Sequence, residues 1–97
     1  MFPSNATITR DPKVVYRHLQ EGGVLLHLGS GQYYGLNQTG YVIWALIKEQ
    51  ISISALLAGL REHFQDAPGL EEDMQVFLDG LRHRGLIHVL SGDGMQP

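Results

Sequence analysis

The sequence contains no cysteine at any of its 97 positions. A disulfide framework, a thiolate zinc site and a cysteine nucleophile are therefore all excluded. No apolar run approaches the roughly 20 residues that a membrane-spanning helix needs. The first five residues also lack the basic stretch followed by an apolar run that marks a secretory signal. These absences fit a reducing compartment, and we expect the protein to work in the cytoplasm without a membrane partner.

Basic residues are also scarce. The chain has seven lysines and arginines in total and ten aspartates and glutamates, so its formal net charge is −3. Modules that bind nucleic acid usually carry a basic patch or stripe, and no such cluster occurs in this chain. Arg82 and Arg84 come nearest to one, but their segment also carries the carboxylates Glu71, Glu72, Asp73 and Asp79. We therefore expect no nucleic-acid partner.

Short runs rich in β-branched and aromatic residues fill the first third of the chain. They span residues 13–19, 24–28 and 32–36, and glycine-containing turns at residues 21–23 and 29–31 separate them. Short strands joined by tight turns predict an antiparallel meander. Residues 1–12 contain two prolines and favour an N-terminal arm, in which residues 6–9 are suited to a short extended piece.

The spacing of apolar residues then changes to that of helices. Asn37 is placed to cap a first helix over residues 38–49, and Ser52 to cap a second helix that continues to Phe64. A third helix over residues 71–84 begins with three carboxylates, which suit the positive end of its dipole. Gly85 is suited to end it. Residues 86–90 favour a short last strand, and residues 91–97 favour a flexible tail.

These elements predict one domain over residues 13–90. Its class is α+β, with a three-stranded antiparallel sheet followed by three helices. A sheet with one apolar face is buried when amphipathic helices cover that face, and the arrangement resembles a winged-helix-like domain.

Candidate groups for catalysis or metal binding lack a functional spacing. No two of the five histidines form an H-x-x-x-H pair on one helix, and only His18 and His27, in adjacent predicted strands, are placed to approach each other. No serine lies in a G-x-S-x-G elbow. The acidic start of the third helix has a sufficient structural explanation. We therefore expect no catalytic residue, no metal site and no cofactor, and we predict that the chain is not an enzyme.

An ordered set of motifs runs through most of the chain. It consists of a leucine pair, a glycine turn, an aromatic strand ending in Leu-Asn, a helix start with Thr-Gly and Ile-Trp, and an acidic helix ending in Gly-Leu-Ile. The positions are Leu25-Leu26, 29–31, 33–37, Thr39-Gly40, Ile43-Trp44, Asp73-Met74, Phe77-Leu78, Leu81 and Gly85-Leu86-Ile87. Over about residues 13–87 this order resembles the PqqD-like family, also called RiPP recognition elements. It looks most like the stand-alone members from lasso-peptide clusters.

The resemblance implies a domain that binds the leader of a ribosomally made precursor peptide and presents it to tailoring enzymes. The leader would add as a β-strand to the edge of the third strand, in the groove between that strand and the third helix. For the lasso type, the implied leader anchors are an aromatic, a proline and a leucine. The implied enzymes are a transglutaminase-like leader peptidase and an asparagine-synthetase-like cyclase. The version that serves pyrroloquinoline quinone synthesis works with a radical-SAM enzyme instead.

The residues themselves favour the same kind of site. The strand at residues 32–36 ends the sheet, so one of its edges is open to another strand. Because side chains alternate along a strand, we expect Tyr34 and Leu36 to face the helices and Tyr33 to face away. The flank of the third helix should form the opposite wall. The candidate peptide-binding residues are Gln32, Tyr33, Tyr34, Gly35, Leu36, Asp73, Val76, Phe77, Gly80 and Arg84.

Two other hypotheses stay open from the sequence. A winged-helix DNA-binding regulator would share the topology, although Asp73 and Asp79 on its recognition helix would meet phosphates poorly. A structural subunit would stabilise an enzyme without touching the peptide. The open strand edge also permits edge-paired or strand-swapped dimers, so the oligomeric state is left open.

Overall fold

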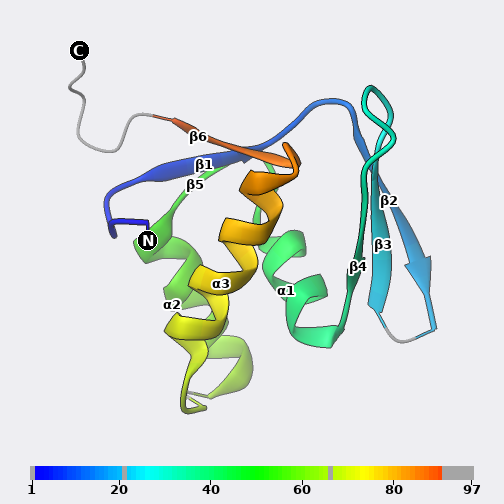
Figure 1. The fold of residues 1–97 in the computed structure, drawn as a ribbon. Coiled ribbons are helices and arrows are strands. Elements are labelled where there is room, and N and C mark those ends of the chain that lie inside the picture. The colour runs from blue at the N-terminus through cyan, green and yellow to red at the C-terminus, as the bar shows by residue number, and fades with distance from the viewer. Residues whose placement is uncertain (1, 21, 66, 91–97) are drawn as a thin grey trace.

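The computed structural model describes residues 2–20, 22–65 and 67–90, which form two small sheets and three helices (Figure 1). The predicted α+β class is confirmed. The elements are, in chain order, β1 (Thr7–Arg10), β2 (Val14–Leu19), β3 (Gly22–His27), β4 (Tyr33–Leu36), α1 (Gln38–Leu46), β5 (Gln50–Ser52), α2 (Ile53–Phe64), α3 (Leu70–His83) and β6 (Ile87–Leu90). The tail expected at residues 91–97 lies outside the described residues.

Strands β2, β3 and β4 form the predicted antiparallel meander, which we call the meander sheet. Leu25 of β3 lies opposite Tyr16 of β2 and Tyr34 of β4. Leu25 is fully buried, and its two neighbours pack against the same core. Because side chains alternate along each strand, the residues between them face the other side of the sheet. One face of the meander sheet therefore joins the core and the other faces solvent.

The helices begin where the sequence predicts but differ in length. The side chain of Asn37 accepts a hydrogen bond from the backbone N–H of Gly40, and that of Ser52 accepts one from Ala55, so both predicted caps are confirmed. Helix α1 ends at Leu46, earlier than expected, because residues 50–52 are drawn into β5. The hydroxyl of Thr9 donates to the carbonyl of Glu49 at 2.5 Å and holds this connection against β1.

A second sheet, which we call the terminal sheet, has the strand order β5–β1–β6. The structure differs here from the expected arm, because residues 7–10 supply the central strand of this sheet and Ile8 is fully buried. Phe2 is also held in the core. Its backbone N–H donates to Gln75 Oε1 at 2.7 Å, and Gln75 Nε2 donates to the Phe2 carbonyl at 2.9 Å. The N-terminal segment is thus part of the fold.

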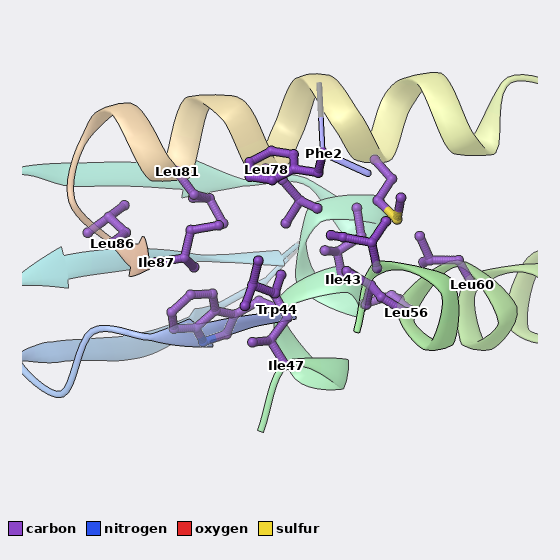
Figure 2. Packing of buried hydrophobic residues seen from close by; sticks show 14 of the residues in the cluster. Phe2, Ile43, Trp44, Ile47, Leu56, Leu60, Leu78, Leu81, Leu86 and Ile87 are labelled. Carbon is purple, nitrogen blue, oxygen red and sulfur yellow. The ribbon is translucent and has the colours of Figure 1, made fainter. Parts of the chain in front are cut away.

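The core lies between the two sheets and the three helices. Figure 2 shows Leu78 and Leu81 pointing from α3 into the apolar layer that holds Ile43, Trp44 and Ile87. Trp44 is 3% exposed. The Arg10 guanidinium lies 4.4 Å from the centre of its ring and donates to the Trp44 carbonyl at 2.6 Å. Desolvation in this position lowers the pKa of Arg10. This contact ties β1 to α1, so the tryptophan of the sequence motif has a structural role.

Asp11 joins the two sheets. Its carboxylate accepts a hydrogen bond from the Lys13 backbone N–H at 2.8 Å. It also lies 3.2 Å from Nε2 of His27 on β3 and 2.6 Å from Nε2 of His88 on β6. The backbone N–H of Asp11 donates to the Leu86 carbonyl. The short connection between β1 and β2 is therefore pinned to a strand of each sheet.

Candidate functional site

A groove of about 380 Å³ lies between β4 and α3, with the first turns of α1 as its floor. Eight residues line it: Tyr34, Asn37, Thr39, Gly40, Ile43, Asp73, Val76 and Phe77. Among them are four of the residues that the sequence singled out, namely Tyr34, Asp73, Val76 and Phe77. Strand alternation and the flank of the third helix therefore bring these four to one place.

The floor of the groove depends on a glycine in α1. A Cβ built on Gly40 would lie 2.9 Å from Cε1 of Phe77, closer than a Cβ atom normally comes to any neighbour. The absence of that atom lets the Phe77 ring pack against α1. The same ring lies 5.8 Å from that of Tyr34, in a tilted arrangement that is favourable for aromatic pairs. Gly40 therefore positions two walls of the groove.

Near the C-terminal end of α3, Tyr34 of β4 forms the wall of the groove. The Arg84 guanidinium lies 4.6 Å from the centre of the Tyr34 ring, within the range of a cation–π contact. A Cβ built on Gly80 would lie 3.0 Å from the Tyr34 hydroxyl, so Gly80 gives room to the tyrosine. This explains why a glycine stands on the groove side of α3, and it places Arg84 over one end of the groove.

The two ends of the groove carry opposite charges. Asp73, in the first turn of α3, lines the groove. At the other end, the Arg84 guanidinium lies over the ring of Tyr34, which also lines the groove. Neither side chain forms a salt bridge with another described residue. Arg84 comes eleven positions after Asp73, which corresponds to about 16 Å at 1.5 Å per residue along a helix. An extended segment spans this distance in about five residues.

The outer edge of β4 is open, because no other described strand pairs with it. The His27 backbone N–H donates to the Gln32 carbonyl at 2.8 Å. Alternate residues of an antiparallel strand bond to the same neighbour, so Tyr34 and Leu36 also direct their backbone groups towards β3. The N–H and C=O groups of Tyr33 and Gly35 therefore face outward. These two residues together offer four unpaired backbone groups to an added strand.

The other predicted residues lie around the groove in different ways. Tyr33 is on the solvent face of the sheet and is 70% exposed. Gln32 lies just before β4, with its carbonyl bonded to β3. Leu36 faces the helices as expected, but it is 5% exposed and belongs to the core, so its side chain does not reach the groove surface. Val76 is 69% exposed and forms the open wall.

Sequence reasoning did not place Asn37, Thr39, Gly40 and Ile43 in the site. They were identified as a helix cap and as parts of a motif. The signal that could have found them is the lack of any linker between β4 and α1. A helix that starts directly after an edge strand must leave its first turn at the end of that strand.

The structure assigns no metal site to the histidines. His18 pairs with Gly23 and His27 with Val14, near opposite ends of the β2–β3 ladder, so the two do not meet. Within residues 2–20, 22–65 and 67–90, no group of three or more His, Cys, Asp or Glu is placed to hold a metal ion. None of the described helices has both the length and the apolar character to cross a bilayer.

The chain matches one family model and is similar to two known proteins. The family model described as coenzyme PQQ synthesis protein D (PqqD) matches residues 22–87. A protein of Azotobacter vinelandii (strain DJ / ATCC BAA-1303) named PqqA binding protein is 37% identical over 54 residues, which are 56% of this chain and 59% of that protein. The alignment thus spans less than two thirds of the curated relative. A solved structure of TbiB1 in complex with the TbiA(beta) leader peptide is 27% identical, with a TM-score of 0.68 over 92% of this chain and 99% of that one.

Proposed function

The chain belongs to the PqqD family, and from this premise we propose that it binds the leader segment of a ribosomally made precursor peptide. The leader adds as a strand to the outer edge of β4 and lies in the groove against α3. The single observation that carries this proposal is the coincidence of an unpaired strand edge with a groove beside it whose walls include Tyr34, Phe77 and Val76. The relatives support it, since one is named for binding PqqA and the other is described with a leader peptide.

The strand edge and the groove contribute differently to the affinity. Four backbone hydrogen bonds at Tyr33 and Gly35 contribute about 0.5–1.5 kcal/mol each. Ordering four or five leader residues costs about 1–2 kcal/mol per residue, so the edge alone sets register without giving tight binding. Each apolar anchor buried against Tyr34, Phe77 or Val76 adds about 1.5–3 kcal/mol. We infer that the walls of the groove determine affinity and the edge determines orientation.

The charges at the two ends of the groove can also orient the leader. A leader that runs antiparallel to β4 brings its earlier residues to Asp73 and its later residues to Arg84, since β4 and α3 run in opposite directions (Figure 1). A basic residue early and an acidic residue later in the bound segment would then be favoured. Both side chains are exposed, so each pair adds about 1 kcal/mol or less.

We also propose the partners that the lasso-type resemblance implies. They are a transglutaminase-like leader peptidase and an asparagine-synthetase-like cyclase, with the chain acting in the cytoplasm as a binding partner and not as a catalyst. The lasso assignment is supported by the Thr39-Gly40 and Ile43-Trp44 motif together with the N-terminal strand β1. A radical-SAM enzyme is the alternative partner.

Fluorescence anisotropy tests the leader proposal directly. The probes are labelled leader segments of short precursor peptides encoded beside this gene, with scrambled versions of the same composition as controls. We expect saturable binding of one leader and at least tenfold weaker binding of its scrambled version. If none of these leaders binds more tightly than its control, the proposal is wrong.

A further inference from the structure

The solvent face of the meander sheet carries a row of apolar side chains. Val15, Leu26 and Tyr33 lie directly opposite one another on β2, β3 and β4, and they are 43%, 37% and 70% exposed. Residues paired in this way stand about 5 Å apart across the sheet, so the three form a continuous strip. No described helix covers this side, as Figure 1 shows, since all three helices lie on the other side of the sheet.

Leu19 lies at one end of the same face, and Leu28, two residues after Leu26 and bonded to the Lys13 carbonyl, extends the face beyond β3. Of the eight large hydrophobic residues that are exposed in the described part of the chain, five belong to this face: Val15, Leu19, Leu26, Leu28 and Tyr33. A gathered apolar patch of this kind is typical of a surface that another molecule covers. Single exposed apolar residues, such as Val89 elsewhere, need no such explanation.

The charged side chains that the structure describes on this face all have one sign. Arg17 lies on β2 opposite Val24, and Lys13 precedes β2 beside Leu28, whose backbone N–H donates to the Lys13 carbonyl. None of the described residues that point outward from this sheet is acidic, although the whole chain has a net charge of −3. A partner that fits the face is therefore apolar at its centre and acidic at its margin, because charges across an interface are arranged to be complementary.

We propose that the outer face of the meander sheet is the docking surface for the enzyme that acts on the bound peptide, through an apolar patch with an acidic margin. This inference rests on the proposed function. A second copy of the chain fits the face poorly, since its own Lys13 and Arg17 would meet the same charges. An anionic membrane also fits poorly, because attraction to it is built from clusters of four to eight basic residues and this face has two.

The position of the face allows the peptide and the enzyme to be bound together. Strand β4 is shared: Tyr34 turns into the groove, whereas Tyr33 turns to the outer face. The leader takes the edge of β4 and the groove side of α3. An enzyme on the outer face therefore reaches the strand next to the leader without displacing it.

Matched pairs of variants test this assignment. Val15→Ser removes an apolar side chain from the outer face, and Val89→Ser removes a similarly exposed valine from the terminal sheet. Arg17→Glu reverses a charge on the face, and Lys48→Glu reverses one between α1 and β5. Each variant is titrated by biolayer interferometry with the purified peptide-modifying enzymes encoded beside this gene. Leader affinity is measured in parallel, since Val15 and Arg17 are outside the groove.

We expect V15S and R17E to weaken binding of one of these enzymes about tenfold or more, while V89S and K48E change it less than about twofold. Leader affinity should stay within about twofold for all four. The inference is overturned if V15S and R17E bind that enzyme as tightly as the unaltered chain, or if no enzyme binds while the leader does. Loss of leader binding by the unaltered chain would instead overturn the proposed function.

Two further measurements decide between occupants. Sedimentation velocity of the unaltered chain and of V15S shows whether the face pairs two copies, and co-sedimentation with vesicles of phosphatidylcholine and phosphatidylserine shows whether it binds a membrane. We expect a monomer in both samples and no vesicle binding. A dimer that V15S dissociates, or vesicle binding that R17E abolishes, would overturn the enzyme assignment.

Discussion

The two sheets have the same number of strands but leave different surfaces uncovered. In the terminal sheet the central strand β1 is paired on both sides and Ile8 is fully buried, so the sheet binds residues 7–10 to the end of the described chain. In the meander sheet the outer edge of β4 is unpaired and one whole face is exposed. The terminal sheet closes the fold, and the meander sheet keeps backbone and apolar groups available for partners.

The difference follows from where in the sequence the strands of each sheet lie. The meander is built from strands that are neighbours in sequence, so its pairing needs only short turns between them. The terminal sheet joins segments from the beginning, middle and end of the described chain, so it can form only when the helices bring them together. We therefore expect changes in the terminal sheet to affect stability and changes in the meander sheet to affect binding.

The largest expected effect is on stability, from Ile8→Ala in the terminal sheet. Ile8 is 0% exposed, and truncating a buried isoleucine costs about 2–5 kcal/mol. Urea denaturation followed by circular dichroism measures it. Val15→Ala in the meander sheet is the control and should cost less than about 1 kcal/mol, because Val15 is 43% exposed. Equal losses for the two variants would contradict the division between the sheets.

The second effect is on binding, from Val76→Asp in the wall of the groove. Val76 is 69% exposed, so the change should leave the free energy of unfolding within about 0.5 kcal/mol. It places a charge where the leader buries an apolar anchor, and we expect the affinity for the leader to fall about tenfold or more. Anisotropy titration measures this, with Val89→Asp on the terminal sheet as control. Unchanged affinity in V76D would remove Val76 from the site.

A smaller effect on leader affinity is expected from Gly40→Ala. Alanine in a helix is favoured over glycine by about 1 kcal/mol, but the new Cβ would lie 2.9 Å from the Phe77 ring. We expect the ring to shift towards Tyr34 and narrow the groove, which should lower leader affinity severalfold with little loss of stability. Gly59→Ala in α2 is the control, since it lies outside the groove. If G40A binds the leader as tightly as G59A, then Gly40 does not position the groove.

Much of the meander and of the helices could be predicted from sequence, because their signals are local. Alternation over a six-residue strand such as β2, together with the caps Asn37 and Ser52, decides the structure within a few neighbouring residues. The terminal sheet could not be predicted in this way. Its strands β1 and β5 have four and three residues, too short for a clear period. Thr7 pairs with Ser52 and Leu90, far along the chain.

The residues of the site show the same difference between local signals and contacts that are distant in sequence. Alternation placed Tyr34 towards the helices, and the helical flank placed Asp73 and Val76 opposite it. Alternation also turned Leu36 towards the helices, but it could not show that this side chain lies below the groove surface, because that depends on where β4 ends relative to α1. The contribution of Gly40 could not be predicted either, because it depends on the close contact with Phe77, which comes more than thirty residues later in the chain.

The smallest effect concerns Asp11, which joins the two sheets. The Lys13 backbone N–H, followed by the His88 ring, lowers the pKa of the Asp11 carboxyl. A carboxyl with a lowered folded-state pKa contributes stability above its unfolded value of about 3.9, and this contribution is lost as the pH falls through the folded-state pKa. Asp11→Asn should therefore cost up to about 1 kcal/mol at pH 7, a small amount because its partner His88 is half exposed.

Urea midpoints at pH 7 and pH 3 measure this, with the exposed Asp79→Asn as control. The gap between D11N and the unaltered chain should narrow at pH 3, whereas D79N should match the unaltered chain at pH 7. The same gap at both pH values would mean that Asp11 joins the sheets through its shape and not its charge. A gap that narrows would show that the terminal and meander sheets are coupled by one ionised side chain. Leader affinity in D11N would then report whether the binding sheet needs that coupling.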